Sequence, residues 1–159
     1  MALAEDLLEQ AFLLLNKESK NPKQASLRRA VSTAYYALFH LLIQEASANW
    51  SRKDTRDYLA RAFEHATMYR ACKRAENAAY AASVWPQVAA KLRSVARTFR
   101  ELQDQRHLAD YSNATKWVRI EASAQVNQCE AAFSDWKSIR HEYVAQRYLV
   151  SLLSNYKEK

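Results

Sequence analysis

The sequence predicts an all-α fold, and two features of its composition carry that prediction. The 159 residues include no Gly and only two Pro, Pro22 and Pro86. Hairpins and sharp turns draw on Gly for backbone conformations with positive φ. The common residues, among them Ala, Leu, Arg, Gln, Glu and Lys, favour helices. A β-rich fold is therefore excluded, as are a P-loop and a dinucleotide-binding fingerprint, because both motifs need glycines.

The length and the lack of internal repeats predict one domain over residues 1–159. The helices predicted below would make it an up-down bundle. The first residues contain acidic side chains and no basic leader, so we expect no signal peptide. No apolar run approaches the roughly 20 residues that span a bilayer. Two cysteines, Cys72 and Cys129, are too few for a disulfide framework. We expect a reduced, cytoplasmic protein with no membrane partner.

Helical periodicity predicts two helices in the first third of the chain. The first covers residues 3–16, where leucines and Ala11 recur on one side. A polar connection around Pro22 follows. The second covers residues 24–49, with an apolar stripe that runs from Leu27 through Val31 and Leu38 to Leu42. Both stripes have the spacing of helices that pack one face on a core.

Three further helices are expected in the rest of the chain. One runs from residue 54 to 73, before a weaker pattern over residues 74–85. The next covers residues 86–109, because Pro86 suits the first turn of a helix. The last begins near residue 115, after a break that contains several capping residue types. It carries a stripe from Val118 to Tyr143 and is expected to kink or divide near Arg140.

The net charge of +7 is concentrated in the middle of the chain. Residues 50–107 hold twelve basic and six acidic side chains, whereas the flanking segments are nearly balanced. Such an excess can attract a polyanion such as RNA, or it can simply form a solvated basic face. Charge alone leaves these two interpretations open.

Polar side chains form second stripes beside the apolar ones. On the second predicted helix, Arg29, Thr33, Tyr36 and His40 recur at helical spacing. On the third, the same spacing places Arg61 and His65 one turn apart on one face. On the fourth, Arg106 follows the buried side, whereas His107 lies about 100° further round. The alternative to a functional site is that these side chains are hydrogen-bonded packing residues at helix seams.

His40, His65 and Cys72 are also residue types that can bind a metal ion. Neither an HExxH motif nor a paired CxxC motif supports such a site. No Cys or Ser is paired with a base in the manner of a nucleophilic enzyme. We therefore expect no metal and no other cofactor.

Three blocks of the sequence resemble the HEPN-domain superfamily of small helical bundles. They are the tyrosine-rich LRRAVSTAYYALFHLL, then RAFEH, and the FRELQDQRHLADY segment that ends in RHLADY. The resemblance covers most of the chain. It implies a four-to-five-helix up-down bundle, commonly a homodimer. Many members are metal-independent endoribonucleases, and several are toxins or belong to defence systems. Others are non-catalytic partners of nucleotidyltransferases, or scaffolds.

The ribonuclease members carry an Arg, four to six further residues and then a His. Arg100 and His107 fit this spacing, whereas Arg61 and His65 have only three residues between them. A second family ending resembles His141–Tyr143, but Trp136 stands where its Arg would be. Combined with the polar stripes, the resemblance suggests catalytic groups at His107, Arg106, His65 and Arg61. Tyr36, His40, Arg29 and Arg100 are the candidates for binding RNA or a nucleotide.

Two functions from different classes therefore follow. The first is a metal-independent endoribonuclease of the toxin or defence type, which uses His and Arg for acid-base chemistry and phosphate binding. The second is a non-catalytic module that binds a nucleotide, RNA, or a protein partner such as a nucleotidyltransferase or an antitoxin. In the second case Arg106 and Asp110 would form a structural ion pair, or Asp110 would cap the next helix. A homodimer is expected in either case.

Overall fold

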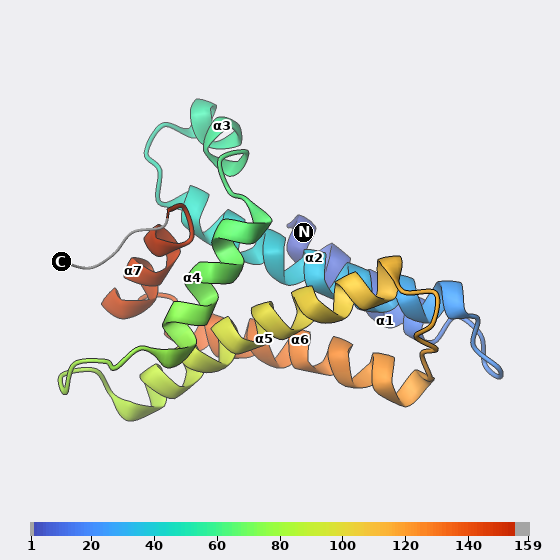
Figure 1. The fold of residues 1–159 in the computed structure, drawn as a ribbon. Helices are drawn as coiled ribbons and strands as arrows, with labels where there is room; N and C mark the ends of the chain where they lie inside the picture. The colour runs from blue at the N-terminus through green and yellow to red at the C-terminus, as the bar shows by residue number, and fades with distance from the viewer. Residues whose placement is uncertain (1, 155–159) are drawn as a thin grey trace. The chain divides into compact units, whose positions relative to one another are not determined.

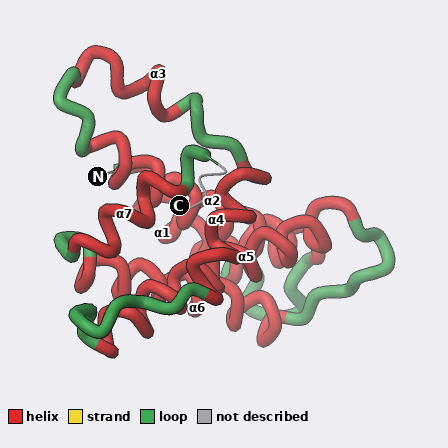
Figure 2. The backbone as a smooth tube through the Cα atoms, turned by 60° about the vertical axis from the view of Figure 1, so that its left-hand side comes forward, coloured by secondary structure: helices red, strands yellow, loops and turns green. Residues whose placement is uncertain are grey.

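The computed structural model describes residues 2–154 and shows helices joined by loops (Figure 1). Within this range there are seven α-helices, one short 3-10 helix and no strand. In Figure 2 the described backbone carries only the helix and loop colours. The elements are α1 (Leu3–Leu15), α2 (Gln24–Ala48), η1 (Lys53–Thr55), α3 (Arg56–Ala60), α4 (His65–Asn77), α5 (Pro86–Tyr111), α6 (Arg119–Ile139) and α7 (Tyr143–Ser151). The predicted all-α class is confirmed.

The chain forms two compact units. Unit 1 consists of Met1–Leu41 and Glu101–Phe133, and unit 2 of Leu42–Arg100 and Ser134–Lys159. Their boundaries fall inside α2, α5 and α6, so each of these helices contributes a segment to both units. That the chain is a single domain stays a prediction.

Unit 1 is held together by apolar packing and by polar contacts near the helix ends. Its buried side chains include Leu27 and Leu38 of α2 and Val126 of α6. The Gln24 side chain donates to the carbonyl of Trp117 (2.6 Å) and accepts from its backbone N–H (2.9 Å). These two bonds tie the start of α2 to the segment before α6, which lies 93 residues away in the sequence.

The turn between α1 and α2 contains the one residue with positive φ among residues 2–154. Asn21 has a φ of 50°, in the left-handed region. In a chain without Gly, Asn is among the residues that adopt this conformation at least cost. The same connection is fixed by Ser26, whose hydroxyl donates to the carboxylate of Glu18 at 2.8 Å. That bond is the main reason that the pKa of Glu18 is lowered.

Unit 2 packs α4, α7 and segments of α2, α5 and α6 around large buried side chains. Trp136, Phe99 and Met68 are completely enclosed. Helices α4 and α7 contact each other, and the Cys72 Sγ and Tyr148 Oη atoms are 2.9 Å apart across that contact. Burial raises the pKa of the Cys72 thiol to about 12.

The helix predicted over residues 54–73 is wrong in its first half. The structure has η1 and the short α3 there, and residues 61–64 form a turn and an extended segment before α4 begins. Tertiary contacts favour this break. Phe63 is buried, and Arg56 donates to the carbonyls of Ala48 (2.9 Å) and Trp50 (2.8 Å) at the end of α2.

Other predicted boundaries lie close to the observed ones. Pro86 is the first residue of α5, and α5 extends to Tyr111, two residues beyond the predicted end. The last predicted helix begins at Arg119 instead of residue 115. Its expected division near Arg140 is confirmed by the gap between α6 and α7. No helix within residues 2–154 combines the length and apolar character that crossing a membrane requires.

Candidate functional site

The candidate site lies in unit 1, where the last two turns of α5 face α2. At its centre is Arg106, an arginine with only 9% of its side chain exposed. A cation is rarely buried to this extent unless nearby groups compensate for lost hydration. The surroundings of this guanidinium therefore decide what the site can do.

Two tyrosine rings and one carboxylate surround the Arg106 guanidinium. Its central carbon lies 4.9 Å from the ring centre of Tyr35 and 5.6 Å from that of Tyr36, within the range of cation–π attraction. The Arg106 Nη1 atom is 3.7 Å from Asp110 Oδ2. Asp110 also accepts a hydrogen bond from the Ser32 hydroxyl at 3.3 Å. The charge is thus stabilised, although the ion pair is longer than a hydrogen bond.

Hydrogen bonding of the guanidinium is incomplete. Its Nε–H group is buried and has no hydrogen-bond acceptor among residues 2–154. The Nη2 group donates to the Nε2 atom of His107 at 3.5 Å, which is long for a hydrogen bond. Because a guanidinium can only donate, this contact requires an unprotonated His107 Nε2. A buried arginine with unused donors favours an additional anionic partner.

His107 differs from Arg106 in that it faces solvent. It is exposed, and its ring stacks at a tilt on Tyr111, with 5.8 Å between the ring centres. The sequence predicted this difference between adjacent residues, with Arg106 on the buried side of the helix and His107 away from it. A buried cation and an accessible imidazole consequently meet at one place on α5.

The end of α5 is itself held in position. Arg28 donates from Nη1 to the carbonyl of Ala109 at 2.9 Å and from Nη2 to the carbonyl of Thr115. The first bond satisfies one of the free carbonyls at the helix terminus. The negative end of the helix dipole also favours positive charge near Arg106 and His107. The local fold therefore supports the positive charge of Arg106.

Of the predicted site residues, the structure brings Tyr36, Arg106 and His107 together. Arg29 is exposed near the start of α2. His40 is half-buried and packs edge-on against Phe39, with ring centres 5.3 Å apart. Burial lowers the pKa of His40. Arg29 and His40 thus lie on α2 in unit 1, whereas the contacts from α2 to Arg106 come from Tyr35 and Tyr36, in the helical turns between them.

Arg61 and His65 do not share a helical face, which corrects the prediction. Arg61 follows the end of α3, is exposed and lies over the ring of Tyr58 at 5.7 Å. His65 is half-buried and is the first residue of α4. The turn at residues 61–64 removes the one-turn spacing that a continuous helix would have given them. Both belong to unit 2.

Arg100 belongs to an ion pair in unit 2. Its Nε and Nη2 atoms donate to the two carboxylate oxygens of Glu76 at 2.7 and 3.0 Å. Arg97 adds a third contact to Glu76 at 3.3 Å. These hydrogen bonds lower the pKa of Glu76 and raise that of Arg100. The guanidinium of Arg100 is thus occupied by a carboxylate that links α4 to α5.

Sequence reasoning missed three residues that shape the cluster: Ser32, Tyr35 and Gln103. Tyr35 is completely buried and its hydroxyl donates to Gln103 Oε1 at 3.3 Å. Helical spacing offered a signal, because Ser32 and Tyr35 are three residues apart on α2, as Gln103 and Arg106 are on α5. The ion pair suggested between Arg106 and Asp110 is present. Asp110 does not cap the following helix, which begins nine residues later at Arg119.

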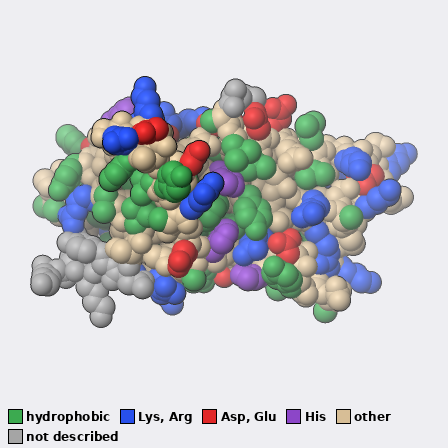
Figure 3. Space-filling view, turned by 90° about the horizontal axis from the view of Figure 1, so that it is seen from above, with side chains coloured by type: hydrophobic (Ala, Val, Ile, Leu, Met, Phe, Trp, Pro, Cys, Tyr) green, Lys and Arg blue, Asp and Glu red, His purple; other side chains and the backbone are tan. Residues whose placement is uncertain are grey.

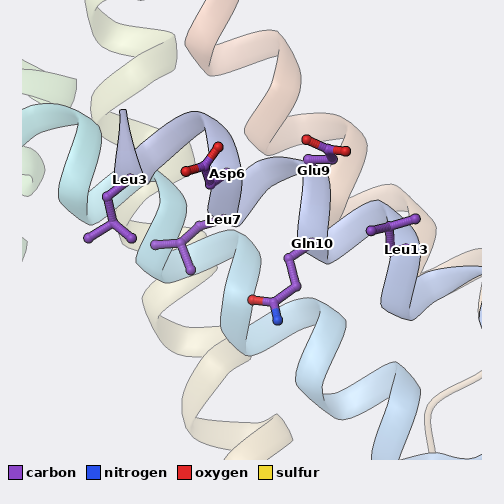
Figure 4. A pocket seen from close by; sticks show the side chains of 6 residues that line it. All are labelled: Leu3, Asp6, Leu7, Glu9, Gln10 and Leu13. Carbon is purple, nitrogen blue, oxygen red and sulfur yellow. The ribbon is translucent and has the colours of Figure 1, made fainter. Parts of the chain in front are cut away.

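A second feature of unit 1 is a shallow hollow of about 380 Å³ along α1. Figure 4 shows Leu3, Leu7 and Gln10 along one side of this helix, with Asp6 and Glu9 on another. Within the described part of the chain, its only charged lining groups are these two carboxylates, which would repel a phosphate. The hollow therefore does not suit the RNA chemistry that the sequence suggested.

The basic side chains do not form a single block on the face shown in Figure 3, where Lys and Arg lie scattered among apolar groups. Several arginines of the basic middle segment make local contacts. Arg52 pairs with Asp54, and Arg93 donates to the carbonyl of Ala78 and stacks on Tyr80. Among the described residues, no group of three or more His, Cys, Asp or Glu side chains could hold a metal ion.

Comparisons with known proteins give no match to this chain, whether with family models, curated proteins or solved structures.

Proposed function

We propose that this chain is a HEPN-like, metal-independent endoribonuclease whose site is built on Arg106 and His107. One observation carries the proposal: an exposed imidazole lies 3.5 Å from a buried guanidinium that has an unused donor. Two of the blocks that resemble the HEPN superfamily also meet there, because Tyr35 and Tyr36 of AYYALFH pack on Arg106 of RHLADY.

The chemistry needs only these side chains and the RNA itself. The 2′-hydroxyl attacks the adjacent phosphorus, and the bond from phosphorus to the 5′-oxygen breaks. The products are a 2′,3′-cyclic phosphate and a 5′-hydroxyl end. His107 would accept the 2′-proton or protonate the leaving oxygen, the acid-base role that histidine most often takes in enzymes. Arg106 would stabilise the added negative charge on the phosphate, and Tyr36 would stack on a base.

A homodimer would supply the second acid-base group that this scheme needs. Leu108 and Tyr111, the neighbours of the site on α5, are 41% and 71% exposed, which leaves apolar surface beside His107. Such surface favours contact with a second chain. His65 and Arg61 remain candidates for supporting roles, and Arg29 and His40 for contacts to RNA, whereas the guanidinium of Arg100 is occupied by Glu76.

The test is cleavage of mixed single-stranded RNA by the purified full chain in EDTA, with detection of 2′,3′-cyclic phosphate ends. The His107→Ala variant should cleave at least about 100-fold more slowly than wild type. His141→Ala removes another exposed histidine, in the turn between α6 and α7, and should leave the rate unchanged. Absence of cleavage by wild type, or unchanged cleavage by both His107→Ala and His65→Ala, refutes the proposal.

The packing of Arg106 favours one alternative, a non-catalytic module that binds RNA, a nucleotide or a protein such as a nucleotidyltransferase or an antitoxin. Tyr35, Tyr36 and Asp110 surround this arginine as they would a structural cation. In that case wild type would bind labelled RNA or nucleotide without cleaving it. His107→Ala would then keep the affinity within a few-fold, whereas Arg106→Leu would lower the melting temperature.

A further inference from the structure

A groove of about 910 Å³ lies within unit 2, between the end of α4, the connection over residues 78–85, and α7. Its floor is apolar, with Ala71 and Ala75 of α4, Leu92 of α5 and Val144 of α7 among the lining residues. None of the candidate site residues lines it. The groove is therefore a feature that the proposed ribonuclease function does not use.

The wall formed by residues 78–85 is fixed in place by side chains. Arg93 donates to the carbonyl of Ala78 at 2.9 and 3.3 Å, and its guanidinium lies 4.7 Å from the ring centre of Tyr80. The Tyr80 hydroxyl donates to the carbonyl of Ala75 at 3.0 Å. A wall held in this way loses little conformational entropy when a ligand binds.

Helix α7 exposes apolar surface at the groove. Tyr143 and Val150 of α7 both line it, with 78% and 69% of their surfaces exposed. Large exposed apolar side chains that continue a groove are typical of protein-binding surfaces. Tyr and Arg are also the residue types that most often dominate binding energy at such surfaces.

Charge determines the kind of partner. Among residues 2–154, the lining includes Arg74 and Arg147 and no acidic residue. Both arginines are exposed. Arg74 donates to the carbonyl of Ser154, which leaves its positive charge uncompensated by that contact. The groove therefore presents an apolar floor between positive charges, which is complementary to a segment that carries apolar and acidic side chains together.

We propose that this groove binds an acidic peptide segment of a partner protein, with the apolar side chains of the peptide on the alanine floor and its carboxylates at Arg74 and Arg147. The size supports a peptide that inserts several side chains, because the volume is near the upper end of the range for small-ligand pockets. The binding is independent of the RNA chemistry proposed for unit 1.

The experiment selects a phage-displayed library of random 16-residue peptides on the full chain. Enriched peptides should combine Asp or Glu with large apolar residues, and their affinity should fall as salt rises. Fluorescence anisotropy then measures binding of the synthesised peptides to two groove variants, Arg74→Glu and Val150→Asp. Each should weaken binding at least about ten-fold.

Arg70→Glu is the matched control, since it makes the same charge change one turn earlier on α4, outside the groove. It should leave the affinity within about two-fold. Circular dichroism verifies that every variant is folded. Two groove variants are used so that the test can still be made if one of them does not fold. Failure to enrich any peptide that binds tighter than roughly 100 µM overturns the proposal. So does equal binding to the groove variants, or a groove that instead binds dodecanoate or a single-stranded RNA oligonucleotide.

Discussion

Replacement of Glu76 by Gln tests whether Arg100 serves the fold instead of RNA. Glu76 accepts two hydrogen bonds from Arg100, at 2.7 and 3.0 Å, and one from Arg97 at 3.3 Å. Only 15% of the Glu76 side chain and 24% of the Arg100 side chain are exposed. The substitution keeps the shape of residue 76 and one acceptor oxygen, but the amide nitrogen cannot accept, so at least one of the three hydrogen bonds is lost.

The size of the effect follows from these contacts. A hydrogen bond to a charged group contributes about 1.5–3 kcal/mol, and the partial exposure of Arg100 reduces that contribution. Loss of the charge and of at least one such bond should lower the free energy of unfolding by about 2 kcal/mol. Urea denaturation near neutral pH measures this difference, and an unchanged slope with urea shows that the same surface is exposed on unfolding.

A second pair in the same unit provides the control. Arg52 donates to Asp54 with similar bidentate geometry, at 3.1 and 2.8 Å, but these side chains are 71% and 66% exposed and only two residues apart. Because solvent screens an exposed pair, Asp54→Asn should leave the free energy of unfolding unchanged within error. Equal effects of Glu76→Gln and Asp54→Asn would refute the argument from burial.

Glu76→Gln should also change how the free energy of unfolding depends on pH. Arg100 holds the pKa of Glu76 below its ordinary value of 4.5. A carboxyl whose pKa is lower in the folded state contributes stability above its unfolded pKa and loses it as the pH falls through the folded value. Wild type should therefore lose more stability than Glu76→Gln between about pH 5 and pH 3. Parallel acid profiles would contradict the assignment.

Two further predictions concern buried groups. Burial raises the pKa of Cys72 to about 12 and also raises that of Cys129. Neither thiol should therefore react with Ellman's reagent near pH 8 unless the protein is unfolded in urea. Rapid reaction of the folded protein would contradict this prediction. Burial lowers the pKa of His40 from 6.5, so its contribution to stability is present above that value and is lost as the pH falls. Acidification from about pH 7.5 to 5 should therefore destabilise wild type more than His40→Gln in urea titrations, with His141→Gln behaving as wild type.

The sequence could predict a helix where a residue type that favours a helix end marks its boundary. Pro86 marks the start of α5, and the absence of Gly excludes most alternatives to helix. The break at residues 61–64 could not be predicted, because Arg61, His65 and Cys72 continue a helical spacing through it. That break depends on the burial of Phe63 and on hydrogen bonds from Arg56 to the end of α2, which no local pattern reveals.

The candidate site was predictable only in part, for a similar reason. The position of Arg106 on the apolar side of α5 predicted its burial, and the next residue was expected to face elsewhere. The pairing of this arginine with Tyr35 depends on how α2 and α5 pack in unit 1. Periodicity assigns a residue to a face of its own helix, but it does not identify which side chain of another helix will meet it.

The arginines show why net charge is a weak guide to function in this chain. The basic excess of residues 50–107 suggested a surface for RNA. Yet Arg56 completes the end of a helix, Arg93 fixes the wall of a groove, and Arg100 neutralises Glu76. Each of these cations has a local acceptor that accounts for its presence. Arg106 differs, because its carboxylate partner is 3.7 Å away and its Nε–H has no acceptor within residues 2–154. Incomplete hydrogen bonding does not by itself distinguish this cation, because the half-buried Arg119 and Arg140 also have an Nε–H without an acceptor there. Arg106 is distinguished by the burial of its whole side chain, and the proposed anion site depends on that burial more than on the sum of the charges.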